Sequence, residues 1–292
     1  MKLSIVAEGG GMRGAYAAGA IYALYSYFGL KKVDYATGSS ASIGTLAYYT
    51  SGQTNIGMHI WPKFAPEKKF MSLRNIFAGH PILNVDYMID EVFKKYIPLD
   101  KNKIKNSKTK FIVPLTNADN GQAEYFDNKT KMDFFEILKA AMAAPFAYGK
   151  EIKINGSYYI DGSFSDPLPI DISPITDSRK IIILTKRECD VENFKAEKIL
   201  SYIMKWKLKP HLHRAIKDSY AVYKEKIEKI KALERGGDFV IIPSQKMSRF
   251  DNRRKTILES IGRGYKNTIS NNKLAEFVTN LKDSNKKYYF SD

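Results

Sequence analysis

The chain has 292 residues, of which 44% are hydrophobic and 27% are charged, a composition typical of a globular protein with its own core. Its single cysteine, Cys189, excludes an intramolecular disulfide, and no apolar run approaches the roughly 18 residues of a membrane-spanning helix. The net charge of +16 favours anionic partners such as lipid surfaces or nucleic acid, although charge alone identifies no ligand.

The first fifty residues alternate between strand patterns and helix patterns. The expected elements are a strand at 2–7, a helix at 12–29, a strand at 33–37 and a helix at 43–49. Strands that alternate with helices in this way predict a parallel sheet covered by helices.

The rest of the chain divides into two parts by composition. The first part predicts a helix at 86–96, paired strands at 110–115 and 122–127, a helix at 133–143, a hairpin at 152–160 and a strand at 180–185. The second predicts basic helices at 196–208 and 211–234, a strand at 238–242 and helices near 253–264 and 271–282. We therefore expect a core at 1–190 and a basic, mainly helical region at 191–292 that packs on the same sheet.

Three consecutive glycines follow the first predicted strand. Gly9, Gly11 and Gly14 fit the dinucleotide-binding template, and Asp34 lies about twenty residues further on, where an acid would bind the ribose. That acid belongs at the carboxyl end of the second strand, whereas Asp34 stands near its start. Backbone N–H groups beside a helix N-terminus also form an anion site, which acyl transfer requires for its oxyanion. Arg13 would add positive charge there or hold the loop through carbonyl contacts.

The second strand ends in a serine-rich turn. Ser40 stands where the nucleophile stands in the G-x-S-x-G turn between a strand and a helix, and Gly38 supplies the small residue on the strand side. Ser42 replaces the second glycine, and its hydroxyl is suited to cap the following helix. Taken alone, these serines are more typical of a helix N-cap. Because the glycine loop follows the neighbouring strand, we favour catalysis.

A nucleophilic serine requires a base, and Asp161 is the best candidate. It ends the predicted hairpin, and Gly162 allows the backbone to turn sharply and present the carboxylate. His211 and His213 follow in the Ser–Asp–His order of α/β-hydrolases. They lie in a basic segment, however, and nearby positive charge disfavours the imidazolium that a catalytic base must become.

These motifs, in this order, resemble the patatin-like phospholipase family. The corresponding segments are Gly9-Gly10-Gly11-Met12-Arg13-Gly14, Gly38-Ser39-Ser40-Ala41-Ser42 and Asp161-Gly162-Ser163. The segment Asp166-Pro167-Leu168-Pro169 is also similar to the family pattern. Residues 70–73 and the basic C-terminal region look like the bacterial branch of small cytoplasmic members. The resemblance is good over residues 1–185 and loose beyond.

The resemblance implies an α/β fold, a three-layer α/β/α sandwich with a mostly parallel central sheet. It implies a serine acyl hydrolase (phospholipase A, lysophospholipase or lipid esterase) with Ser40 as nucleophile and Asp161 as base. The glycine loop would hold the oxyanion through Gly9, Gly10 and Gly11, with Arg13 beside it. No cofactor and no metal is implied.

Other functions remain open. Ser42 and Ser163 replace glycine-like positions, which suggests as an alternative a non-catalytic lipid- or membrane-binding module on the same fold. The N-terminal apolar run is too short for a signal peptide, so we expect a cytoplasmic protein that meets membranes, if at all, at an anionic surface. Nucleic acid is not expected, because Tyr202, Trp206, Tyr220 and Tyr223 follow the helical spacing of packing residues.

Overall fold

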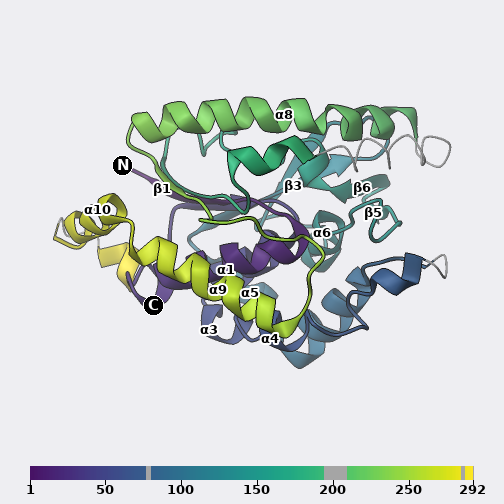
Figure 1. Cartoon of the computed structure of the whole chain (residues 1–292), viewed down its shortest axis with the longest axis horizontal. Coiled ribbons are helices and arrows are strands. Elements are labelled where there is room, and N and C mark those ends of the chain that lie inside the picture. Colours follow the sequence, from purple (N-terminus) through teal and green to yellow (C-terminus); the bar gives the residue numbers. More distant parts are fainter. Residues whose placement is uncertain (77–79, 194–208, 284–286, 292) are drawn as a thin grey trace.

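A central sheet with helices on both faces organises the chain (Figure 1). The computed structural model describes residues 1–76, 80–193, 209–283 and 287–291, so the helix predicted at 196–208 lies outside the described residues. Within them, the strands of the sheet follow the order β5-β6-β3-β2-β1-β7-β8, and β4 pairs with β3. The strands are β1 (Leu3–Ala7), β2 (Tyr35–Gly38), β3 (Lys110–Asn117), β4 (Ala123–Asp127), β5 (Ile152–Ile154), β6 (Ser157–Asp161), β7 (Arg179–Ile183) and β8 (Phe239–Ile241).

The centre of the sheet is parallel and one end is antiparallel. The pairs β3–β2, β2–β1, β1–β7 and β7–β8 are all parallel. The strands β4, β5 and β6 form antiparallel pairs. The predicted α/β sandwich with a mostly parallel sheet is therefore confirmed. The C-terminal region contributes β8 to this sheet, while the division of the chain at residue 190 stays a prediction.

Alternate side chains of each strand enter different layers of the core, because successive residues point to opposite faces. In β1, Ile5 packs into the larger apolar cluster and Val6 into the smaller one on the other face. The long helix α8 (Pro210–Arg235) covers that second face, where Tyr223 and Ile227 are buried (Figure 1). The packing role expected for Tyr223 is thus observed.

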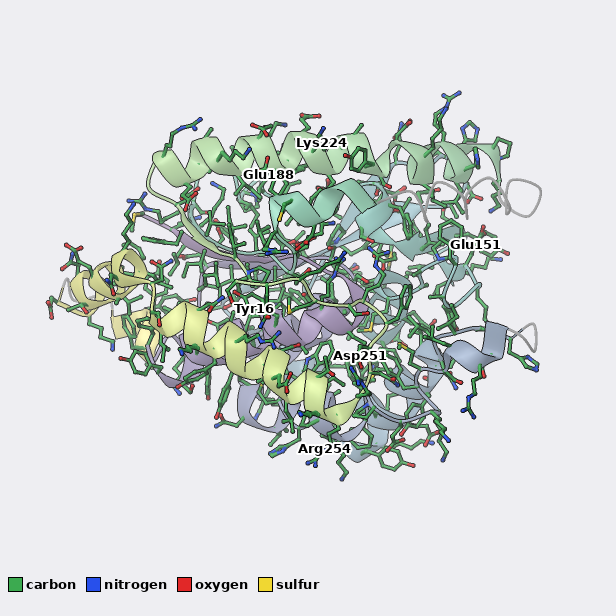
Figure 2. The ribbon with its side chains drawn as sticks, viewed as in Figure 1. Tyr16, Glu151, Glu188, Lys224, Asp251 and Arg254 are labelled. Carbon is green, nitrogen blue, oxygen red and sulfur yellow. The ribbon has the colours of Figure 1, made fainter. Side chains whose placement is uncertain are left out.

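Helices α1 (Gly14–Ser26) and α9 (Arg254–Ile269) cross in unusually close contact on the first face. A Cβ on Gly19 would lie 2.0 Å from the carbonyl oxygen of Ile261, and one on Gly264 would lie 2.0 Å from that of Tyr16. The Tyr16 hydroxyl accepts a hydrogen bond from the Asn267 side chain at 2.9 Å. Figure 2 shows Tyr16 in the interior beside α9. Only glycines permit backbones to approach this closely.

The remaining helices lie around these layers. They are α2 (Ala41–Thr50), α3 (Thr54–Gly57), α4 (Ile60–Lys63), α5 (Lys101–Asn106), α6 (Phe134–Ala141) and α10 (Asn272–Asp283). Short 3₁₀ turns form η1 (Gly11–Arg13), η2 (Leu73–Ile76), η4 (Gly162–Phe164), η5 (Glu188–Asn193) and η6 (Lys287–Phe290). No helix within the described ranges combines the length and the apolar character needed to cross a membrane.

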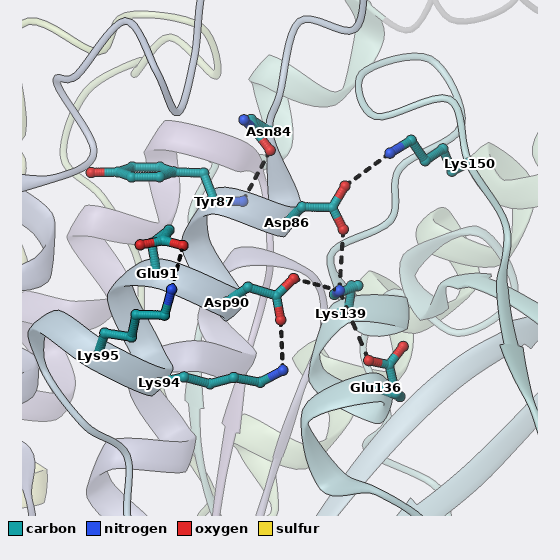
Figure 3. Close-up of polar contacts among 10 residues, drawn as sticks. All are labelled: Asn84, Asp86, Tyr87, Asp90, Glu91, Lys94, Lys95, Glu136, Lys139 and Lys150. Carbon is teal, nitrogen blue, oxygen red and sulfur yellow. Dashed lines mark hydrogen bonds and ion pairs between the residues drawn. The ribbon is translucent and has the colours of Figure 1, made fainter.

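The predicted amphipathic helix at 86–96 is present, but it is wound as a π-helix, η3 (Tyr87–Tyr96). An ionic network fixes it to α6 (Figure 3). The buried Lys139 ammonium of α6 lies 3.1 Å from Asp86 Oδ1 and 2.8 Å from Asp90 Oδ2. Burial opposes ionisation of Asp86, but hydrogen bonds from Lys150, Tyr148 and Lys139 outweigh it and lower the pKa of Asp86 to about 2.

Candidate active site

The register of the parallel sheet brings the glycine loop and the serine turn together. Ala7, the last residue of β1, pairs with Gly38, the last residue of β2. The loops that follow these strands therefore leave the sheet at the same edge. A Cβ on Gly38 would lie 2.4 Å from the Ala7 carbonyl oxygen, and one on Gly9 would lie 2.6 Å from that of Ser39. Both positions require glycine for this close contact.

Ser40 occupies a strained turn between β2 and α2. Its φ of 51° and ψ of −129° lie in a region that residues with a side chain rarely adopt. The chain turns here directly into helix α2, whose first bonds run from the N–H of Ser42 to the Ser39 carbonyl and from that of Ile43 to the Ser40 carbonyl. This is the backbone form of a nucleophile elbow, which presents the serine hydroxyl above the strand end.

The two neighbouring serines fix this elbow to other parts of the site. The Ser39 hydroxyl accepts from the Gly9 N–H at 3.0 Å and donates to the Pro167 carbonyl at 2.9 Å. The Ser42 hydroxyl is fully buried and donates to the Glu8 carbonyl at 2.5 Å. Ser42 thus replaces the glycine of the motif without disturbing the turn, because its side chain finds a backbone acceptor.

The glycine loop presents two backbone N–H groups. Gly10 and Gly11 have φ values of 138° and 60°, which favour glycine. Within the described residues, no hydrogen bond leaves the N–H of either one. The N–H of Gly9 differs, because it donates to Ser39. Arg13 Nε donates a hydrogen bond to the Gly10 carbonyl oxygen at 3.4 Å, and the Arg13 charge also acts on Lys186.

Asp161 reaches Ser40 because β2 and β6 share one edge of β3. Ile112 of β3 has Thr37 of β2 on one side and β4 on the other. Leu115 of β3 has Asp161 of β6 on one side and β4 on the other. Since β4 occupies one edge, β2 and β6 must lie end to end along the other. They run in opposite directions, so their last residues face each other. A Cβ on Gly162 would lie 2.1 Å from the Pro114 carbonyl oxygen, so the turn after Asp161 requires glycine.

The Asp161 carboxyl is buried, with 1% of its surface exposed. Burial raises its pKa above the ordinary carboxyl value. Hydrogen bonds from the Ser40 side chain and from Ser163, together with the positive charge of Arg249, oppose this shift. The Ser163 N–H donates to Asp161 Oδ1 at 2.9 Å. Raising the pKa of a carboxylate makes it a better acceptor for a serine proton.

A buried ion pair lies at the start of the glycine loop. Glu8 accepts a hydrogen bond from the Thr185 N–H at 2.7 Å, and its other carboxylate oxygen lies 3.2 Å from Lys186 Nζ. The Lys186 ammonium also lies 3.5 Å from the ring centroid of Tyr223. Burial lowers the pKa of Lys186 to about 8, although Glu8 opposes the shift. Sequence patterns gave no sign of this pair, because nearly 180 residues separate its members.

An apolar cavity of about 70 Å³, which is partly open to solvent, lies beside Ser40 and Gly11. Its walls come from α2, from the segment around Trp61, from η3 and from the end of α6, and they include Met12, Phe70, Leu83, Met88, Phe93 and Met142. Sequence analysis did not identify this cavity. Its residues are spread over 130 positions and follow ordinary core spacing.

Arg249 is a further residue that sequence analysis missed. It belongs to the segment between β8 and α9, and its carbonyl accepts the Met12 N–H at 3.0 Å. Its charge acts on both Asp161 and Lys186. The alternative bases, His211 and His213, lie at the start of α8 and do not line the cavity. In the part of the chain that the structure describes, no three His, Cys, Asp or Glu side chains gather as metal ligands.

The chain is similar to known proteins in sequence and in structure. The sequence pattern of the family described as Patatin-like phospholipase matches residues 5–173. The chain is 21% identical over 186 residues to the uncharacterized protein YjjU of Escherichia coli K12, a match that covers 63% of this chain and 51% of the relative. The crystal structure of VipD from Legionella pneumophila superimposes with a TM-score of 0.48 at 14% identity, over 94% of this chain and 67% of VipD. Because the family pattern covers more than half of its length, the chain belongs to the patatin-like phospholipase family.

Proposed function

We propose that this protein is a serine acyl hydrolase that cleaves fatty-acyl esters, with phospholipid or lysophospholipid as the substrate class. The observation that carries the proposal is the meeting of Ser40, on a strained turn, with the buried Asp161 at the mouth of an apolar cavity. Family membership supports lipid ester hydrolysis in general terms. Ser40, Asp161 and the glycine loop are our assignment for this chain.

In the proposed reaction, Ser40 Oγ attacks the ester carbonyl carbon while its proton passes to the Asp161 carboxylate. The N–H groups of Gly10 and Gly11 hold the negative charge that develops on the carbonyl oxygen. Among the described residues, neither N–H donates a hydrogen bond to another group. Collapse of this intermediate breaks the bond to the alcohol, which leaves with the proton from Asp161. A water molecule, deprotonated by Asp161, then attacks the acyl-serine carbonyl. The bond to Ser40 Oγ breaks as Asp161 returns the proton to it, which releases the fatty acid and restores the free serine.

Ser42 and Ser163, which replace glycine-like positions of the family motifs, favour catalysis over a purely binding role. Ser42 is anchored to Glu8, and Ser163 donates to the carboxylate of Asp161. Both residues, Ser42 through its hydroxyl and Ser163 through its backbone N–H, therefore hold the proposed machinery together and neither blocks it. Lys and Arg residues give the chain its charge of +16, which supports contact with anionic lipid surfaces in a protein of this class.

A fluorophosphonate serine-hydrolase probe tests the assignment. We expect one covalent adduct on Ser40, located by peptide mapping, and no adduct on Ser40→Ala. Hydrolysis of p-nitrophenyl esters should disappear in Ser40→Ala and in Asp161→Asn, while His211→Ala retains it. Full ester hydrolysis in folded Ser40→Ala would overturn the proposal.

A further inference from the structure

A buried lysine of helix α8 contacts the segment that follows the proposed base. The Lys226 side chain is almost fully buried, and its Nζ lies 2.9 Å from Asp166 Oδ1. The same ammonium pairs with Asp171, further along that segment. Because a buried charge is costly unless it is paired, these contacts fix α8 and residues 166–171 to each other.

The carboxylate of Asp166 depends on this lysine. The Tyr125 hydroxyl donates to Asp166 Oδ2 at 2.8 Å, but within the described part of the chain no hydrogen bond reaches Oδ1. The Lys226 charge therefore compensates that buried oxygen. The Asp166 N–H also donates to the Gly162 carbonyl at 2.8 Å, which ties the segment to the turn after the proposed base. Without the lysine, a buried carboxylate would lose its ion pair, and we expect the segment to shift.

Two hydrogen bonds continue from this segment to the glycine loop. The carbonyl of Pro167 accepts from the buried Ser39 hydroxyl at 2.9 Å. The Ser39 oxygen in turn accepts from the Gly9 N–H at 3.0 Å. We call this series of contacts, which runs from Lys226 through Asp166, Pro167 and Ser39 to Gly9, the α8–loop link. It connects a helix of the C-terminal region to the start of the glycine loop.

The position of Gly9 sets the distance between the glycine loop and the proposed nucleophile. A Cβ on Gly9 would lie 2.6 Å from Ser40 Cβ, so the loop backbone lies directly against the nucleophile. The proposed oxyanion donors, Gly10 and Gly11, follow at once in the chain. Such donors act at about 2.7–3.1 Å from the oxyanion, and a misplacement of about 1 Å can lower a rate about a hundredfold. Holding Gly9 therefore holds the donors in place.

We propose that Lys226 is a positioning residue for the reaction: through the α8–loop link, it holds the glycine loop at the distance from Ser40 that oxyanion stabilisation requires. Helix α8 belongs to the basic C-terminal region, which contains none of the three sequence motifs. The inference rests on the proposed hydrolase function for its catalytic meaning. The link itself, however, is measurable without any hydrolysis.

The test is a double-mutant cycle on the hydrolysis of p-nitrophenyl butyrate. Lys226→Met should lower kcat about tenfold to a hundredfold and leave KM within about twofold, because oxyanion donors act in the transition state. Ser39→Ala breaks the α8–loop link nearer the loop and should cause a similar loss. The double variant should be within about twofold of Ser39→Ala alone, whereas a lysine that acts independently of the link would give losses that multiply.

Control variants separate positioning from stability. Lys229→Met removes an exposed lysine of α8 that pairs with Asp171 at 2.8 Å, and it should keep kcat. Ile227→Ala removes a buried apolar side chain of α8 and should lower stability, yet the folded protein should keep kcat. Lys226→Met/Asp166→Asn removes both charges and should recover most of the lost rate. If Lys226→Met does not fold, Lys226→Gln replaces it, because its amide can still donate a hydrogen bond.

Hydrogen exchange at the Gly9 amide, followed by mass spectrometry of overlapping peptides, measures the link without turnover. Lys226→Met should speed this exchange about tenfold, and Lys229→Met should leave it unchanged. The inference is overturned if Lys226→Met keeps kcat, if the losses multiply, if removal of both charges recovers no rate, or if exchange at Gly9 is unchanged. Coupled exchange in a wild type that hydrolyses no ester would overturn the proposed enzyme but retain the α8–loop link.

Discussion

The buried hydroxyl of Ser42 donates a hydrogen bond to the carbonyl oxygen of Glu8 at 2.5 Å, which joins the start of α2 to the residue before the glycine loop. We predict that Ser42→Ala lowers the free energy of unfolding by about 1–3 kcal/mol, because a buried carbonyl loses its donor. The rate of fluorophosphonate labelling at Ser40 should fall as well. Urea denaturation and labelling kinetics measure the two effects.

Ser26→Ala is the matched control for this variant. The Ser26 hydroxyl also donates to a backbone carbonyl, that of Tyr22 at 2.7 Å, but it is exposed at the end of α1. Its removal should change stability by less than about 0.5 kcal/mol. Equal stability of the Ser42 and Ser26 variants would show that the bond to Glu8 contributes little.

Asp161→Asn should increase stability while it abolishes hydrolysis. Because burial raises the pKa of Asp161, the folded protein binds this proton more tightly than the unfolded chain does. The free energy of unfolding therefore falls as pH rises from the ordinary carboxyl value through the raised pKa, and it stays lower above it. The uncharged asparagine removes this cost, so the variant should have the higher melting temperature at pH 8.

The stability difference between Asp161→Asn and the wild type should disappear when the pH falls below the ordinary carboxyl value, where both chains carry a neutral group. Asp177→Asn, an exposed aspartate, should leave the melting temperature unchanged at each pH. A lower melting temperature of Asp161→Asn at pH 8 would contradict the expectation that burial of this charge is costly.

The acid limb of the pH–rate profile should depend on Ser163 and Arg249. The proposed base must be ionised, so kcat/KM falls as pH drops through the pKa of Asp161. The Ser163 hydroxyl and the Arg249 charge both hold that pKa down against burial. Ser163→Ala and Arg249→Gln should each shift the acid limb to higher pH, and the double variant should shift it further.

Arg253→Gln serves as the control for Arg249, because Arg253 is an exposed neighbour that pairs with Asp251 at 2.5 Å. Its acid limb should match that of the wild type. A shift to lower pH in Arg249→Gln would reject the electrostatic influence of Arg249 on Asp161.

Lys186→Met should be strongly destabilising. Removing one partner of the buried pair leaves the Glu8 carboxylate without its ion pair, which costs about 3–5 kcal/mol. The double variant Glu8→Gln/Lys186→Met removes both charges and should recover much of the loss. Lys231→Met is the control: this exposed lysine pairs with Glu188 at 2.7 Å, and such pairs contribute about 0–1 kcal/mol. Urea denaturation of the wild type and of these three variants measures the differences in stability.

Sequence patterns predicted the parts of the fold that depend on neighbours in the chain. The strand at 33–37, the hairpin at 152–160 and the helix at 133–143 all occur within a few residues of their expected positions. Each depends on local periodicity or turn chemistry, which a few residues fully encode. The close approach of the glycine loop to the serine turn also followed, because parallel strands end at the same edge.

Features that depend on distant segments could not be predicted in this way. The end-to-end placement of β2 and β6 on one edge of β3 follows from pairing choices that no local pattern encodes. No local sequence pattern predicts that Glu8 pairs with Lys186. Residues 87–96 have the period of a surface helix, and this period did not predict their π winding. These are tertiary effects that override local preference.

The close crossing of α1 and α9 has a consequence for attempts to shorten the chain. The three motif segments all lie before residue 170, so a fragment ending near residue 185 would appear self-sufficient. In such a fragment, however, the backbone groove beside Gly19 would face water, and Ala15 and Ala18 would lose the apolar cover that Ile257 provides. The glycine loop would also lose the carbonyl of Arg249 that fixes Met12. The last third of the protein is therefore part of the fold that holds the site, and a truncated fragment should aggregate.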